Sequence, residues 1–170
     1  MSYKLFGALG FGLGGIIVGL AGDYMIFAYI LMGALGSAFL TIPARNLKLT
    51  LLASLIGGLS FFIGFTIPMF VFMVMVEPPF KYLFLGLIMG LFTGATLGFA
   101  FRNIKVFALW GMAGFGLSYG TSFMLLEFLR PIFPDFFQVI VMILAGAIGG
   151  AFLGHAASIV NDNTKLLPKV

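Results

Sequence analysis

The chain has no cysteine and few charged residues, and both shortages restrict what it can be. Without cysteine it has no disulfide framework and no thiolate chemistry, and the redox compartment stays unspecified. Charged residues make up 8% of the 170 residues and hydrophobic residues 62%, with a mean hydropathy of +1.20. Ordinary soluble domains are roughly 25% charged and about 45–50% apolar. Such a chain cannot cover itself with a polar surface, so we expect an integral membrane protein whose main partner is the lipid bilayer.

The motifs of soluble enzymes and of nucleic-acid-binding proteins are also missing. The formal net charge is only +4, and no basic cluster marks a surface for DNA or RNA. The sequence contains no HExxH motif, no nucleophile triad and no phosphate-binding loop before a lysine. The glycines between residues 10 and 15 lie inside an apolar run and follow no strand. The sequence therefore predicts a non-catalytic protein with no cofactor, no metal site and no nucleic-acid partner.

Six apolar stretches reach or approach the length of about 20 residues that a helix needs to cross a bilayer. They cover residues 5–22, 24–43, 49–76, 82–101, 106–128 and 136–160. The third contains Pro68 and is long, so it could be tilted, kinked or extended beyond the bilayer. The first follows Lys4 and resembles a secretory signal peptide, but its glycine spacing favours a packed helix. We expect one all-α polytopic membrane domain over residues 1–170, with six transmembrane helices and no soluble domain.

The charged residues predict an orientation. In the six-helix arrangement one side receives Lys4, Arg45, Lys48, Arg102, Lys105, Lys165 and Lys169, and the other only Lys81 and Arg130. Because Lys and Arg concentrate in cytoplasmic loops, we expect both termini in the cytoplasm and the protein in a plasma or inner membrane. The acids on the outer side are Asp23, Glu77, Glu127 and Asp135. Three of them, Asp23, Glu77 and Asp135, recur once per hairpin loop and could attract cations as a ring, or they could simply be polar loop residues.

Small residues spaced by four follow one face of three of the expected helices. The stripes are Gly86, Gly90, Gly94 and Gly98; Gly33, Ser37 and Thr41; and Gly146, Gly150 and Gly154. In an apolar helix such a stripe lets a neighbouring backbone approach closely. The segments 31–48 and 88–105 also align with each other, and both end in Arg-Asn-x-Lys. The alignment predicts three repeated helical hairpins with glycine-rich packing faces, at approximately residues 5–48, 49–105 and 106–165.

Few ionisable residues could carry chemistry. His155, the only histidine, is a weak candidate for cofactor binding, or it could be a helix-end residue bonded to backbone or a lipid headgroup. Glu127 could serve ion transport, but Arg130 stands three residues later and favours a helix-end ion pair.

Basic and hydroxyl side chains leave two interpretations each. The basic residues at the inner interface, which are Arg45, Lys48, Arg102 and Lys105, could bind anionic headgroups or a partner's acidic surface, or could be topological anchors. Hydroxyl groups within the spans could line a polar path, or they could bond to a carbonyl group of their own helix or to a neighbouring helix. They are Ser37, Thr41, Thr93, Thr96, Ser118, Tyr119, Thr121 and Ser122. Trp110 is expected to be an interfacial anchor.

Two functions fit these observations. The first is a structural or accessory subunit that packs against other membrane subunits or against copies of itself. The second is a small channel or transporter, a class of protein in which internal repeats are common. Six helices with small residues on the first also resemble the substrate-binding subunits of energy-coupling-factor transporters, although the sequence carries no motif specific to that family.

Overall fold

The computed structural model describes residues 2–21, 24–75, 80–129, 132 and 136–166, and of residues 25, 71–75, 80 and 163–166 only the backbone. The regular structure of this part of the chain is entirely helical. Its α-helices are α1 (Tyr3–Leu20), α2 (Met25–Thr41), α3 (Leu47–Met75), α4 (Phe80–Ala100), α5 (Ile104–Leu129) and α6 (Phe136–Leu166). A short 3₁₀ turn, η2 (Ile42–Ala44), follows α2. The expectation of an all-α fold with six long helices is confirmed.

The helix boundaries follow the apolar runs closely, except at the C-terminal end of α6. α3 is continuous through Pro68, although the missing proline N–H leaves the Gly64 carbonyl without its usual helical donor. α6 continues past Val160 through a polar segment to Leu166. Hydropathy marks where a helix leaves the apolar region, but the backbone can stay helical in water. An apolar run therefore predicts the spanning part of α6 and not its end.

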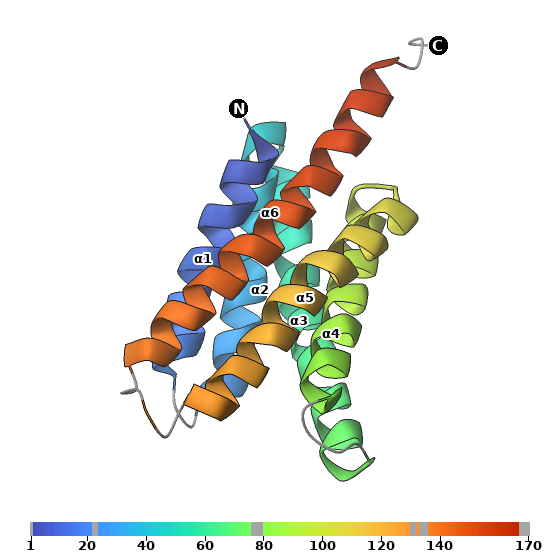
Figure 1. Cartoon of the computed structure of the whole chain (residues 1–170). Coiled ribbons are helices and arrows are strands. Elements are labelled where there is room, and N and C mark those ends of the chain that lie inside the picture. The colour runs from blue at the N-terminus through green and yellow to red at the C-terminus, as the bar shows by residue number, and fades with distance from the viewer. Residues whose placement is uncertain (1, 22–23, 76–79, 130–131, 133–135, 167–170) are drawn as a thin grey trace.

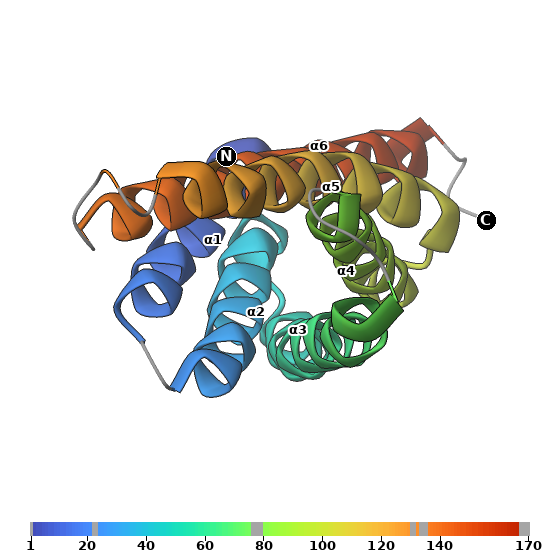
Figure 2. The same cartoon turned by 60° about the horizontal axis from the view of Figure 1, so that its bottom comes forward.

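The six helices form a ring. They run alternately in opposite directions, each contacts its neighbours in sequence, and α6 contacts α1 (Figures 1 and 2). The contacts are most extensive within the pairs α4–α5, α1–α6 and α2–α3. The start of α1, the end of α6 and the α2–α3 and α4–α5 turns lie at the same end of the bundle (Figure 1). We call this the basic end, because it carries Lys4, Arg45, Lys48, Arg102 and Lys105.

Within the described residues, five of the helices are long and apolar enough to cross a membrane, and α5 is the exception. Glycine, serine, threonine and tyrosine lower its hydropathy. Its buried residues are Phe107, Gly111, Gly114, Phe115, Gly116, Ser118, Tyr119 and Gly120. The polar and small residues of α5 thus lie largely inside the bundle, where they contribute nothing to contact with lipid.

Large apolar side chains cover the outside of the ring. They recur at helical spacing, as in Leu5, Leu9 and Leu13 on α1 and in Leu51, Leu55 and Leu59 on α3. Exposed side chains of this size on successive turns are unfavourable in water and suit a hydrocarbon solvent. The fold is therefore that of a multi-pass membrane protein.

Candidate functional site

Three phenylalanines meet at the centre of the ring. Phe11 of α1, Phe61 of α3 and Phe115 of α5 are fully buried. Their ring centroids are 5.5 Å apart for Phe11 and Phe61, and 5.1 Å for each of the other two pairs. We call these residues the phenylalanine triad. It fills the axis of the bundle with side chains from alternate helices.

The sequence analysis did not single out the triad, although a signal for it exists. Each phenylalanine stands four residues after a glycine: Gly7 precedes Phe11, Gly57 precedes Phe61 and Gly111 precedes Phe115, although the same spacing also joins Gly58 to the outward-facing Phe62. With 24 glycines and 22 phenylalanines in the chain, this short pattern does not stand out from its background. Only the meeting of the three side chains distinguishes these phenylalanines from those that face outward.

Two tyrosines continue the aromatic centre. Tyr29 of α2 stacks on Phe65 with centroids 4.0 Å apart, and Tyr119 of α5 stacks on Phe115 at 5.7 Å. The Tyr119 hydroxyl donates a hydrogen bond to Sδ of Met32 at 2.9 Å. The buried Tyr29 hydroxyl has no hydrogen-bond partner among the described residues. The interior is therefore aromatic, and the Tyr29 hydroxyl is one of several buried hydroxyls there without a partner among the described residues.

Three of the other predicted hydroxyl groups bond to their own helices. Thr41 donates to the Ala38 carbonyl at 2.8 Å, Thr96 donates to that of Phe92 at 2.8 Å, and Thr121 donates to that of Leu117. Ser122 is partly exposed. In the part of the chain that the structure describes, the buried hydroxyls of Ser37, Thr93 and Ser118 have no partner.

The small residues on the even helices lie against the backbone of a neighbouring helix. A Cβ atom on Gly33 would overlap the Gly57 carbonyl of α3, and one on Gly90 would overlap the Gly111 carbonyl of α5. A Cβ on Gly150 would overlap the Gly7 carbonyl of α1. A Cβ atom added to Gly86, Gly94 or Gly98 would lie within 3 Å of backbone atoms of α5. One added to Gly146 or Gly154 would lie equally close to the backbone of α1. Ser37 is buried against Gly57. These contacts occur in the helix pairs α2–α3, α4–α5 and α6–α1.

His155 lies beside Trp110. The two rings meet edge to face, with centroids 4.5 Å apart and an interplanar angle of 84°. His155 is partly exposed, and its buried Nδ1 has no partner among the described residues. Across those residues no three His, Cys, Asp or Glu side chains come together. The histidine is thus placed by an aromatic neighbour on α5 and not by other potential ligands.

The two Arg-Asn-x-Lys segments form turns of the same kind. Arg45 and Arg102 are the non-glycine residues with positive φ in the described chain, at 50° and 57°. Asn46 accepts a hydrogen bond at Oδ1 from the Leu49 N–H at 3.1 Å, and the Asn103 side chain likewise accepts from the Val106 N–H at 3.3 Å. In each turn the arginine ends one helix in the left-handed conformation, and the asparagine caps the next helix.

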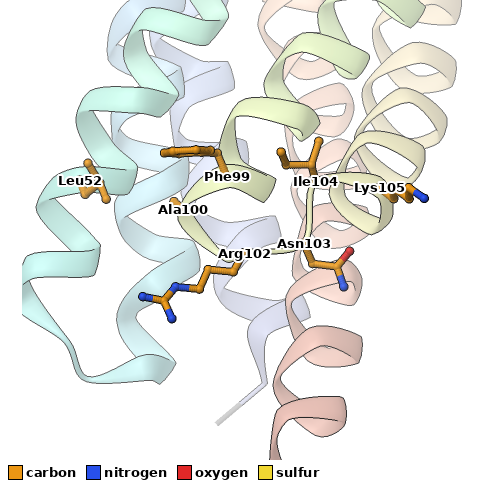
Figure 3. Close-up of a pocket in the computed structure, with 7 residues that line it drawn as sticks. All are labelled: Leu52, Phe99, Ala100, Arg102, Asn103, Ile104 and Lys105. Carbon is orange, nitrogen blue, oxygen red and sulfur yellow. The ribbon is translucent and has the colours of Figure 1, made fainter.

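A hollow of about 780 Å³ opens beside the second turn. Leu52 of α3, Phe99 and Ala100 of α4, and residues 102–105 line it. The Arg102 side chain extends toward the side of α3 that carries Leu52, whereas Lys105 projects the other way (Figure 3). Both basic side chains are exposed, as are those of Arg45 and Lys48 in the first turn. We call this hollow the Arg102 hollow.

The acidic residues can be placed only in part. Glu127 is exposed on α5 and accepts a hydrogen bond from the Tyr82 hydroxyl of α4 at 2.8 Å. Its expected partner Arg130 lies outside the described residues, as do Asp23, Glu77 and Asp135 of the expected acidic ring, and the side chains of Lys165 and Lys169. The link between Glu127 and Tyr82 joins α4 to α5 at the end opposite the basic end.

Comparison with known proteins adds no family: no protein-family model, no curated protein and no solved structure matches this chain.

Proposed function

We propose that the chain is a non-catalytic, multi-pass membrane protein that works as an accessory subunit, using its outer surface to pack against partner helices. The phenylalanine triad is the observation that carries this proposal. A bundle whose axis is filled by fully buried aromatic rings has its interior committed to packing. The side chains available to a partner are then the apolar ones on the outside of the ring.

We further propose that α5 crosses the membrane with the other five helices. Its length of 26 residues is sufficient for a span. Large apolar side chains face outward at several points along it, with Leu109, Leu117 and Phe128 exposed by 62%, 54% and 66%, and the exposed charged residues Lys105 and Glu127 lie near its two ends. The residues that lower its hydropathy are largely buried against α4 and α6.

Three equivalent two-helix units are part of the same proposal. The tight pairs α2–α3, α4–α5 and α6–α1 each bring a stripe of small residues against a glycine of the partner helix, which is Gly57, Gly111 or Gly7. Each pair also contributes one member of the triad. These contacts favour the repeat units α2–α3, α4–α5 and α6–α1. Each unit begins one helix later than the hairpins predicted from the sequence, at residues 5–48, 49–105 and 106–165.

The orientation we propose has the basic end in the cytoplasm. Lys4, Arg45, Lys48, Arg102 and Lys105 belong to turns or helix ends that meet at this end of the bundle (Figure 1). Positive residues resist transfer across the membrane during insertion, so they remain on the cytoplasmic side.

A channel or transporter is the second candidate, and the orphan hydroxyl of Tyr29 favours it. A buried hydroxyl without a partner costs on the order of 1–3 kcal/mol in proteins. A solute or water passing through the bundle would relieve this cost. The triad opposes this function, because its rings would have to separate before anything could pass along the axis.

One pair of experiments separates the two functions. A photo-crosslinking amino acid is placed at Leu55 or Leu109, which are 69% and 62% exposed, and at buried Phe61 as the control. The accessory function predicts a stoichiometric crosslink to one and the same membrane protein from an exposed site and none from Phe61. The protein is also reconstituted alone in liposomes and tested for flux of monovalent ions and small polar solutes. Flux by a monodisperse protein without a crosslinked partner would replace the accessory function with transport.

A further inference from the structure

The Arg102 hollow lies at the depth of lipid headgroups. The apolar run of α4 ends at Ala100, and Arg102 follows two residues later in the turn at the basic end. Side chains at such a helix end lie where the hydrocarbon gives way to phosphate groups and water. The hollow therefore opens toward the bilayer interface.

The hollow is lined by apolar side chains and by the positive charge of Arg102. Phe99, Ile104 and Leu52 are exposed by 69%, 50% and 46%, and all three line it. The Arg102 side chain extends on the same side as Phe99 and Leu52, whereas Lys105 points away (Figure 3). None of the described residues lining the hollow is acidic, so no lining carboxylate occupies the guanidinium.

The backbone at Arg102 does not explain why arginine stands there. Its N–H bonds to the Phe99 carbonyl at 3.2 Å, and the next N–H bonds to the Gly98 carbonyl at 2.8 Å, closing the end of α4. With φ at 57°, this position suits glycine and disfavours residues with a side chain. The backbone therefore gives no reason for arginine rather than glycine at residue 102, and what distinguishes Arg102 from Arg45 is its place beside the hollow.

We propose that the Arg102 hollow binds the phosphate group of an anionic phospholipid. The planar guanidinium of Arg102 pairs with the phosphate through two parallel N–H donors, the geometry that distinguishes arginine from lysine. The first carbons of an acyl chain lie along Phe99 and Leu52. Lys105 contributes a longer-range attraction only, because it points away. This site is independent of the accessory function and would exist in a transporter as well.

Native mass spectrometry of the purified full chain in a non-ionic detergent tests the proposal. Phosphatidylglycerol is the anionic probe, phosphatidylcholine the neutral lipid, and inorganic phosphate the free anion. We expect one tightly held phosphatidylglycerol per chain, with phosphatidylcholine at least about tenfold weaker, because its choline cation offsets the phosphate charge and is repelled by Arg102 and Lys105. Arg102→Gln should weaken the binding of phosphatidylglycerol by about tenfold. Inorganic phosphate at millimolar concentration should not compete, because it lacks the apolar contacts.

Arg45→Gln is the matched control, since Arg45 occupies the same left-handed position of the sister turn but does not line this hollow. It should change affinity by no more than about twofold. A second variant, Arg102→Gly, distinguishes loss of the site from misfolding, because glycine suits the backbone conformation at this position. The Arg102→Gly protein should no longer bind the lipid, and its melting temperature should be unchanged or higher. Equal losses in the two glutamine variants would mean diffuse charge attraction, and unchanged binding in Arg102→Gln would remove the site. Competition by inorganic phosphate would replace the lipid with a free anion. Any of these three results overturns the proposal.

Discussion

The Tyr119 hydroxyl on α5 and Sδ of Met32 on α2 lie 2.9 Å apart, joining two helices that are not neighbours in the ring. Both side chains are fully buried. Met32 also packs against a glycine of α6, because a Cβ atom added to Gly146 would lie 3.0 Å from Cε of Met32. Side chains of α2 and α5 thus meet at the centre next to the backbone of α6, so the ring is held by its interior as well as by adjacent helices.

Removing the Tyr119 hydroxyl should have a small effect. A thioether sulfur is a weak acceptor, so we expect Tyr119→Phe to lower the free energy of unfolding by no more than about 1 kcal/mol. Met32→Ala should cost more, about 2–5 kcal/mol, because it leaves a cavity. Unfolding by denaturant in detergent micelles measures both. A larger loss for Tyr119→Phe than for Met32→Ala would show that the polar contact outweighs packing.

The phenylalanine triad predicts a sharp contrast between adjacent residues. Phe61→Ala should cost about 3–5 kcal/mol, because it removes a fully buried ring from two aromatic contacts. The neighbouring Phe62 is 36% exposed toward the outside of the ring, so Phe62→Ala should cost considerably less. Thermal unfolding of the two variants in the same detergent checks this. Equal losses would be incompatible with a packed centre at Phe61.

Large side chains should not be accepted at the close helix contacts. In Gly90→Leu and Gly150→Leu the new Cβ overlaps a backbone carbonyl of the neighbouring helix, so we expect a loss of about 3 kcal/mol or more. Ile148→Leu is the control on α6, since Ile148 is 48% exposed and the change conserves volume. Melting temperatures and elution profiles in detergent distinguish them. If all three variants melted together, these helix contacts would have to be looser than the structure has them.

The turns at the basic end predict opposite effects at adjacent positions. Arg45→Gly should stabilise the fold by about 1 kcal/mol, because glycine adopts a φ of 50° without strain. Asn46→Ala should destabilise it by about 1 kcal/mol, because the Leu49 N–H loses its cap. Comparing the unfolding free energies of both with the unsubstituted chain tests the turn. Destabilisation by Arg45→Gly would indicate that the guanidinium itself supports the fold.

The proposed span of α5 can be tested directly because the chain has no cysteine to remove. Lys105→Cys and Ile132→Cys lie just inside the start and just beyond the end of α5, and Ile132 is 72% exposed. If α5 crosses the membrane with the basic end inside, a membrane-impermeant maleimide should label Ile132→Cys in intact cells and Lys105→Cys only after permeabilisation. Lys48→Cys is the control for the basic end. Labelling of both ends of α5 from one side would place the helix on the membrane surface.

Much of the fold could be read from hydrophobic runs, because a helix in lipid must satisfy its own backbone and be apolar for about 20 residues. The runs located all six helices, and Arg-Asn-x-Lys marked two turns of the same kind. α5 shows the limit of hydropathy: its glycines, Ser118 and Tyr119 lower the average, and only the structure shows that these residues are buried. The extension of α6 past Val160 shows the same limit for helix length.

The sequence by itself determined that this is a helical, multi-pass membrane protein with most of its positive charges at one end, because composition and charge order along the chain suffice for both. Only the tertiary structure decided that α6 contacts α1, that Phe11, Phe61 and Phe115 meet, and that Arg102 lies along an apolar hollow while Lys105 points away. These relationships depend on which face of each helix turns toward which neighbour. In a chain this apolar, helix faces differ little in hydropathy, so side-chain shape and close backbone contact choose among them.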